Sequence, residues 1–226
     1  HNYTPQSLHF ALTHSSLFER FRMLKRYQNK FAQKAIMRAI KIQLLQQPLN
    51  DAQVLFKQKQ GKIELEINSL NDESSTKAYQ EVKDVEQKAT AAYFSGNYFQ
   101  IFTNHQQQTG IKLNHLDIAH DSVNDFKALK PIILDKVIND NIREVTNFIL
   151  SFVQSIPYST LESRINSSGA GFNPPAQVIW QNQGDCDSKV TLTAAMLRML
   201  MPRIKMVLVF IEQHALIGIE VPVKAG

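Results

Sequence analysis

The stretch QNQGDCDSKVTLTAAMLRML, from Gln181 to Leu200, holds the only cysteine of the 226-residue chain. Beyond that cysteine, apolar residues recur at helical spacing, and Pro202 predicts where the helix ends. The pattern therefore places Cys186 at a helix N-terminus, between Asp185 and Asp187. These two carboxylates raise a chemical question, because nearby negative charge opposes formation of a thiolate.

A helix N-terminus favours a thiolate and offers backbone N–H donors for an oxyanion. Its contribution is about 0.3–1 kcal/mol, which is less than the roughly 1.4 kcal/mol that corresponds to one pKa unit. Asp185 and Asp187 act in the opposite direction, although either can cap N–H groups of the helix. A reactive Cys186 therefore needs an imidazolium partner.

The segment after the helix contains two strand-like runs, KMVLVFI (205–211) and HALIGIEVPV (214–223). The two-residue gap between them predicts an antiparallel hairpin. His214 begins the second run, whereas the other histidines lie in segments without a comparable context. We therefore expect His214 to accept the proton of Cys186 and to protonate the leaving group later.

Other side chains around the cysteine have open roles. Trp180, Gln181 or Gln183 could supply an oxyanion donor or a wall of a substrate groove. Lys189 could offset negative charge or face solvent. Tyr158 is expected as a core aromatic residue with a bonded hydroxyl.

The sequence predicts neither a metal site nor another cofactor. A single cysteine excludes an internal disulfide framework and a thiolate cluster for zinc. The stretch HLDIAHD (115–121) has ligand-type side chains, but their spacing matches no strong metal motif. We expect it to be a solvated loop.

A basic amphipathic helix is predicted over residues 15–47, ending before Pro48. Between Phe18 and Leu45 the acidic side chain of Glu19 stands against eight basic residues: Arg20, Arg22, Lys25, Arg26, Lys30, Lys34, Arg38 and Lys41. The helix could pack on the domain with its charges in water, or lie near anionic lipid. Nucleic-acid binding is not expected, because no groove-reading motif accompanies the charge.

The remaining segments give a coarser picture. Residues 52–70, around Gly61, favour a hairpin over a ragged helix pair, with Ile63, Leu65 and Ile67 on one face. A helix is expected over 72–93, an irregular connection over 103–122, and one or two helices before Pro157. A loop rich in Gly, Ser and Pro precedes the cysteine segment.

Length and composition, with 43% hydrophobic residues, allow one large domain or two small ones. The longest apolar run, Met206 to Ile211, is too short to cross a bilayer. The chain opens HNYTPQ, without Met, which favours a processed or excised chain and an extracytoplasmic location over a cytoplasmic one. The oligomeric state is left open.

The stretch NQGDCDSKVTLTAAMLRML, followed by a strand and then HALIGIEV, resembles the core of the transglutaminase-like superfamily, and in particular its bacterial cysteine peptidase type. Its Gly-Asp-Cys-Asp step, 184–187, is the most specific part, and FVQSIPY (152–158) resembles the segment before the nucleophile loop. The resemblance covers roughly residues 138–223. It implies an α+β fold with a papain/transglutaminase-like core, in which a nucleophile helix packs on an antiparallel sheet.

By this resemblance Cys186 is the nucleophile and His214 the base. Residues 116–226 would form the catalytic core, which would lack its C-terminal end, and residues 1–115 a mainly helical accessory region. The chain departs from the family because no Asp or Asn on a following strand orients the histidine. Glu220 lies roughly 20 Å along an extended strand from His214, and Ala215 replaces the usual tryptophan.

The resemblance implies a cysteine-dependent amide hydrolase, a peptidase or amidase that acts on a peptide or protein through an acyl-enzyme. Two alternatives remain at this stage. One is transglutaminase-type transfer of the acyl group to an amine. The other is a catalytically inactive binding module that retains the fold.

Overall fold

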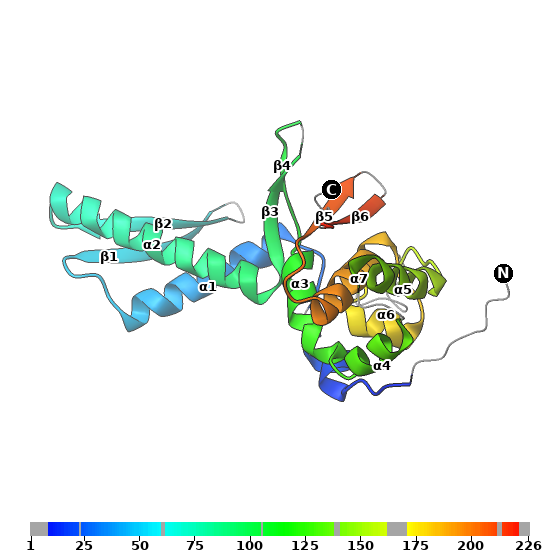
Figure 1. Ribbon diagram of the computed structural model, residues 1–226. Coiled ribbons are helices and arrows are strands. Elements are labelled where there is room, and N and C mark those ends of the chain that lie inside the picture. The colour runs from blue at the N-terminus through cyan, green and yellow to red at the C-terminus, as the bar shows by residue number, and fades with distance from the viewer. Residues whose placement is uncertain are drawn as a thin grey trace. The chain divides into compact units, whose positions relative to one another are not determined.

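A computed structural model describes residues 9–22, 24–59, 62–104, 106–137, 141–161, 171–211 and 214–221. Over these residues the fold is α+β, with helices and three two-stranded sheets (Figure 1). The chain forms two compact units. Unit 1 lies within residues 1–26 and 113–226, and unit 2 is the continuous segment 27–112.

The border between the units differs in part from the border expected at residues 115/116. Its second crossing, at Lys112 to Leu113, lies close to the expected position, but residues up to Arg26 cluster with unit 1. The physical reason is a polar anchor. Asp125, whose side chain is 2% exposed, accepts hydrogen bonds from the Ser16 hydroxyl and the Arg20 guanidinium, each at 2.7 Å.

Unit 2 pairs two helices with a hairpin. Its elements are α1 (Asn29–Gln46), β1 (Ala52–Lys59), β2 (Lys62–Ser69), α2 (Asp72–Gly96), β3 (Phe99–Thr103) and β4 (Thr109–Leu113), the last of which ends at the border. The core joins both helices to one face of the hairpin, and its buried members are Ile40, Leu44, Val82 and Ala89. Asn71 caps α2 by accepting from the Ser74 N–H at 2.8 Å. The β1–β2 hairpin predicted from alternation is confirmed, with Ala52 opposite Ser69.

The continuous helix predicted over residues 15–47 is wrong. A short π-helix, η1 (Ser15–Glu19), is separated from α1 by a non-helical segment, and Gln28 has an extended backbone. Leu17 and Phe21 are buried in unit 1, whereas Ile40 is buried in the core of unit 2. The apolar residues over 15–47 recur at helical spacing, but those that are buried lie in two different cores. One straight helix could not place them in both.

The irregular connection and the solvated loop expected over 103–122 are also wrong. Residues 109–113 form β4, and α3 (His115–Ser122) follows at once. Asn114 caps α3 by accepting from the Asp117 N–H. The residues buried along α3 are His115, Ile118, Ala119 and Ser122, which is helical spacing.

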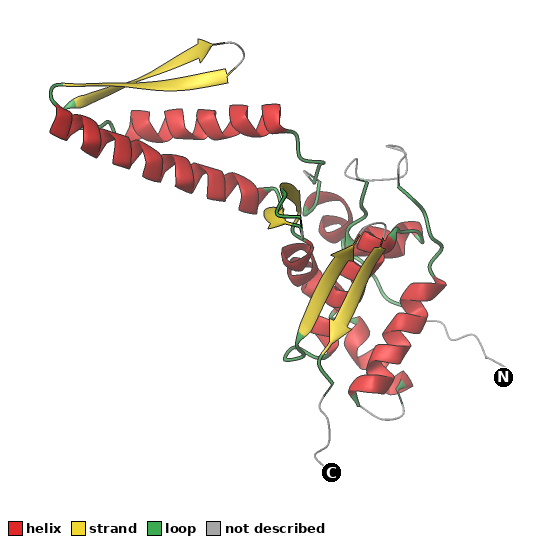
Figure 2. Ribbon diagram, turned by 90° about the horizontal axis from the view of Figure 1, so that it is seen from above, coloured by secondary structure: helices red, strands yellow, loops and turns green. Residues whose placement is uncertain are grey.

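Helix α7 (Cys186–Leu200) is the centre of unit 1. Eleven of its fifteen residues are buried. Around it lie α3, η2 (Val123–Phe126), α4 (Leu129–Lys136), α5 (Ile142–Ser155), α6 (Pro175–Gln181), β5 (Met206–Ile211) and β6 (His214–Ile219). Figure 2 shows the two-stranded hairpin nearest the C-terminus lying over the helices of this unit. The sequence predicted α7 and the β5–β6 hairpin, but not α6. The predicted loop covers residues 164–175, and its residues 164–170 lie outside the described residues.

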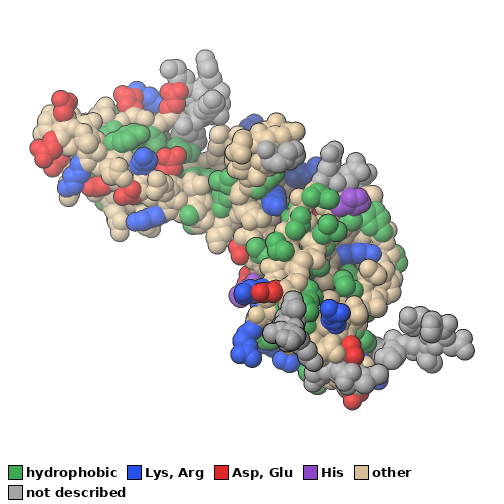
Figure 3. Space-filling view, turned by 45° about the horizontal axis from the view of Figure 1, so that its top comes forward, with side chains coloured by type: hydrophobic (Ala, Val, Ile, Leu, Met, Phe, Trp, Pro, Cys, Tyr) green, Lys and Arg blue, Asp and Glu red, His purple; other side chains and the backbone are tan. Residues whose placement is uncertain are grey.

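The β5–β6 hairpin lays one face on the core of unit 1. In its antiparallel register, Phe210 stands opposite Ala215 and Leu208 opposite Ile217. The face that carries these four side chains points inward, and the opposite face is exposed and apolar, with Val207, Val209, Ile211 and Leu216 at 40–56% exposure. Figure 3 shows hydrophobic side chains on this part of unit 1. No helix among the described residues is both long and apolar enough to span a bilayer.

Candidate active site

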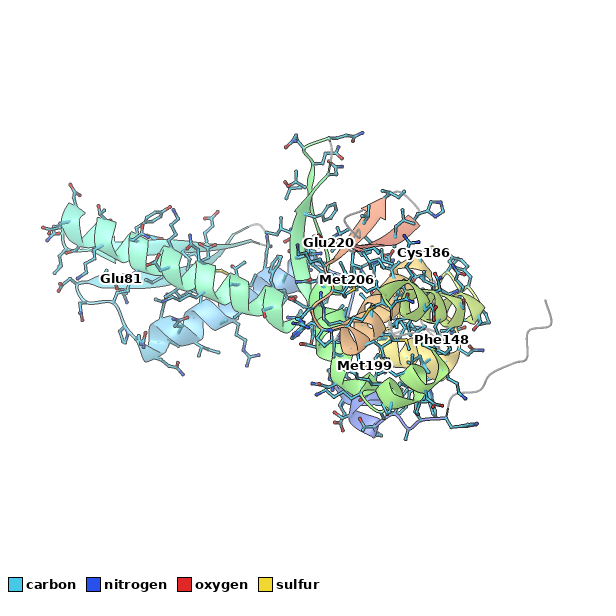
Figure 4. The ribbon with its side chains drawn as sticks, viewed as in Figure 1. Glu81, Phe148, Cys186, Met199, Met206 and Glu220 are labelled. Carbon is cyan, nitrogen blue, oxygen red and sulfur yellow. The ribbon has the colours of Figure 1, made fainter. Side chains whose placement is uncertain are left out.

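Cys186 is the first residue of α7, and its side chain is half-buried. Figure 4 shows Cys186 at one end of this helix and Met199 toward the other. Asp185 is the N-cap, because its Oδ1 accepts from the Ser188 N–H at 2.9 Å. The thiol therefore lies at a capped helix N-terminus, where the helix dipole favours negative charge.

The loop before the cysteine is held by the segment that follows α5. The Gly184 N–H donates to the Pro157 carbonyl at 3.3 Å, and the Ser159 N–H donates to the Gly184 carbonyl at 3.2 Å. A Cβ at Gly184 would lie 3.3 Å from both Ser188 Cβ and Val178 Cγ1, so a larger residue here would push against side chains of both α6 and α7. Tyr158 bridges Gly184 through its backbone, and its side chain is 62% exposed. The expectation of a core aromatic residue at Tyr158 is wrong, because the bridge turns this side chain outward.

A network of amides lies beside the start of α7. Asn173 is fully buried and donates its backbone N–H to Ser188 Oγ at 2.9 Å. Its side-chain Nδ2 donates to Gln181 Oε1 at 2.8 Å, and Gln183 Nε2 also donates to that oxygen at 3.4 Å. Gln181 and Gln183 are thus held next to the helix end, as a groove wall or oxyanion donor requires. The sequence did not single out Asn173.

Trp180 belongs to a different contact. Its indole is 63% exposed and packs edge-on to Phe18 of η1, with ring centroids 6.4 Å apart. On the same helix, Gln177 donates to the Leu17 carbonyl. These contacts attach η1 to α6, so the visible role of Trp180 is to hold the N-terminal segment.

Lys189 is half-buried, and its ammonium donates to the Ile156 carbonyl. The reading as an exposed surface lysine is therefore wrong. This hydrogen bond joins the first turn of α7 to Ile156, the residue that follows α5. The positive charge is fixed in the first turn, on the same helix segment as the two aspartates.

His115 of α3 contacts the first turns of α7. Its Nδ1 lies 3.0 Å from Thr191 Oγ1, and its Nε2 lies 4.0 Å from Asp187 Oδ2. Thr191 donates its single hydroxyl hydrogen to the Asp187 carbonyl at 2.6 Å, so Nδ1 must be the donor to Thr191. This assignment turns Nε2 toward the Asp187 carboxylate. Protonation of Nε2 would place an imidazolium beside Asp187.

Aromatic rings enclose His115. Phe210 of β5 stacks on it at 4.7 Å between centroids, and Phe172 packs edge-on at 4.9 Å. The residue is only 4% exposed. The sequence signal that could have found it is the helical spacing of His115, Ile118, Ala119 and Ser122 described above.

The β5–β6 hairpin runs back along α7 toward Cys186. Met206 and Leu208 line a groove with Arg198 near the C-terminal end of α7, whereas Phe210 lies on His115 near its start. His214, paired with Ile211, therefore begins β6 at the end of the hairpin nearest the first turn of α7.

The His214 ring faces away from α7. It lies on the exposed face with Leu216, because the neighbouring Ala215 is buried. The structure thus brings the Cys186 and His214 segments to one end of the unit, while the ring points outward. Glu220 pairs with Lys205 at 3.0 Å, which gives it a role other than orienting His214.

Comparison with protein-family models finds no match to this chain, and neither a search of curated proteins nor a search of solved structures finds a similar protein. Within the described ranges, no three His, Cys, Asp or Glu side chains are arranged to hold a metal ion.

Proposed function

We propose that unit 1 is a cysteine-dependent amide hydrolase with a core of the transglutaminase-like type, and that Cys186 is its nucleophile. The observation that carries this proposal is the half-exposed thiol at the capped N-terminus of a buried helix, followed in sequence by a hairpin that returns to that helix end. Nucleophilic cysteines depend on such a helix end and on a nearby histidine.

In the proposed reaction, the Cys186 thiolate attacks the substrate carbonyl and forms a tetrahedral oxyanion. The C–N bond breaks as the leaving amine takes a proton from the imidazolium, which gives a thioester on Cys186. Water, deprotonated by the same imidazole, then releases the acid and restores the thiol. We assign the Cys186 N–H and the side-chain amide of Gln181 or Gln183 to the oxyanion.

His214 is the proposed base, because it is the histidine at this end of unit 1 that solvent and a substrate can reach. This role requires its ring to turn from the exposed face of the hairpin toward the sulfur. His115 is nearer to the first turns of α7, but its Nδ1 is bonded to Thr191 and two rings enclose it. We therefore assign His115 to holding α3 against the first turns of α7.

The test is alkylation of Cys186 by iodoacetamide as a function of pH, followed by mass spectrometry. A histidine-paired thiolate reacts well below the pKa of about 8.5 of a free thiol. We expect the parent chain to react in this way and His214→Gln to lose the advantage. His120→Gln, at an exposed histidine paired with Asp121, is the matched control.

The outcomes separate the roles. If His115→Gln removes the low-pH reactivity and His214→Gln does not, the base assignment is wrong and His115 has that role. If Cys186 alkylates like a free thiol in the parent chain, the hydrolase proposal fails and a non-catalytic module takes its place. With a peptide ester substrate, faster acyl release in the presence of a primary amine would favour acyl transfer over hydrolysis.

A further inference from the structure

The outward side of helix α1 is strongly basic. Lys30, Lys34, Arg38 and Lys41 are all exposed, and at 3.6 residues per turn they fall within an arc of about 80°. Helix α1 contains no acidic residue. Of the ion pairs formed by the described residues, none involves these four side chains, and Lys41 contacts the neutral ring of Phe56, with its ammonium 6.0 Å from the ring centroid. The helix therefore carries a stripe of unneutralised positive charge about 16 Å long.

The same side of α1 exposes three large apolar residues. Phe31 is 65% exposed, Ile42 46% and Leu45 70%. By helical geometry they lie directly beside the cations, in an arc of about 60°. On the opposite side of α1, Ala32 and Ile40 are fully buried, and Ile40 belongs to the core of unit 2. The exposed apolar residues are thus additional to those that unit 2 needs for its own core.

We propose that this basic-apolar face of α1, formed by Lys30, Phe31, Lys34, Arg38, Lys41, Ile42 and Leu45, binds the surface of an anionic lipid bilayer. The helix would lie in the plane of the interface. Its cations would contact anionic headgroups, and its apolar side chains would enter the boundary of the acyl chains. Long lysine and arginine stems allow the charges to stay at headgroup level while neighbouring side chains insert.

The combination of charge and aliphatic side chains favours a membrane over a nucleic acid. Both partners offer a dense negative surface. Single-stranded nucleic acids also reward aromatic stacking, but Ile42 and Leu45 have no ring to stack. A bilayer offers an apolar layer directly beneath its charges, which suits both residues.

The test uses the full chain and sedimentation with sucrose-loaded vesicles. We expect binding to vesicles of phosphatidylglycerol and phosphatidylcholine, and little binding to phosphatidylcholine alone. Raising the salt from about 0.1 M to about 1 M shortens the screening length from about 10 Å to about 3 Å and should weaken binding strongly. Double-stranded DNA added at equal charge should not displace the vesicles.

Variants test the two components separately. Each cation removed near an anionic surface should lower the partition coefficient about fivefold, so the triple substitution Lys34→Gln, Arg38→Gln and Lys41→Gln should lower it by roughly 100-fold. The matched control removes three exposed lysines from α2: Lys77→Gln, Lys83→Gln and Lys88→Gln. It should bind nearly as the parent does.

The apolar component is tested by Phe31→Gln combined with Leu45→Gln, which should lower partitioning at least about tenfold. Its control is Leu70→Gln combined with Tyr79→Gln, at residues of unit 2 that are 84% and 63% exposed. The proposal is overturned if the parent chain does not bind anionic vesicles, if DNA displaces them, or if the α1 and α2 variants lose binding equally. It is also overturned if the apolar α1 variant binds as the parent does. Alkylation of Cys186 should be unchanged in all four variants, so this proposal and the hydrolase proposal can fail independently.

Discussion

The two carboxylates that flank Cys186 have separate partners. Asp185 accepts from the Ser188 N–H, and Asp187 faces Nε2 of His115. A hydrogen-bonded carboxylate opposes a neighbouring thiolate less than a bare carboxylate does. Lys189 adds a fixed positive charge in the same turn. The Gly-Asp-Cys-Asp step can therefore present a thiol at a helix end without a large electrostatic penalty.

Removing the cap at Asp185 separates its hydrogen bond from its charge. We expect Asp185→Ala to lower the free energy of unfolding of unit 1 by about 1 kcal/mol, because the Ser188 N–H loses its acceptor. Asp185→Asn keeps an acceptor oxygen and should stay near the parent. Urea unfolding followed by the fluorescence of Trp180, the single tryptophan and a residue of unit 1, measures both. Equal losses in the two variants would contradict a capping role.

Single-residue features were predicted correctly where they depend on residues close together in the sequence. The start of α7 at Cys186 and a cap by one of its aspartates follow from side chains within four positions of each other. The position of His115 against α7 could not be predicted in this way, because its contact with Thr191 joins residues 76 positions apart. The burial of Asn173 beside Ser188 depends in the same way on how α6 meets α7.

At the scale of elements, helical spacing predicted α7 and alternation predicted the β1–β2 hairpin, whereas two apolar runs with a two-residue gap predicted the β5–β6 hairpin. Periodicity failed over residues 15–47, where η1 and α1 present apolar residues to different cores. It also failed over 103–122, where β4 and α3 are too short to give a clear signal. Periodicity identifies an apolar face but does not tell which core that face enters.

An aromatic cluster around the end of α2 predicts a response to alkaline pH. Tyr93 lies 6.2 Å from Phe99, and Tyr27 lies 5.3 Å from the same ring, between centroids. Burial, and secondarily Tyr27, raises the pKa of Tyr93 above 10.0. The folded state therefore holds this phenol proton more tightly than the unfolded state does. Its stabilising contribution is complete below pH 10 and is lost as pH rises through the folded-state pKa.

Tyr93→Phe should therefore flatten the loss of stability above about pH 10. Tyr79→Phe, at a tyrosine of α2 that is 63% exposed, should leave the alkaline loss as in the parent. Urea unfolding followed by far-UV circular dichroism across this pH range measures the difference. An unchanged alkaline loss in Tyr93→Phe would rule out this residue as its source.

At the scale of the whole molecule, unit 2 is a continuous insertion between two segments of unit 1. The sequence indicated an accessory region before the cysteine-containing core, but not that residues before Tyr27 return to that core. The return depends on contacts such as that of Arg20 with Asp125, 105 positions away. No sequence pattern within a single segment can predict a contact between residues so far apart in the chain.

Separate cores predict separate unfolding. Ile40 and Leu192 are both fully buried, the first in the core of unit 2 and the second in that of unit 1. Replacing either with alanine should cost about 2–5 kcal/mol in its own unit. Leu192→Ala should move the urea transition seen by Trp180 fluorescence, whereas Ile40→Ala should move only a part of the far-UV circular dichroism transition. If Ile40→Ala shifts the Trp180 transition as much as Leu192→Ala does, the two units unfold as one cooperative body, because a loss confined to unit 2 cannot lower the stability reported from an independent unit 1.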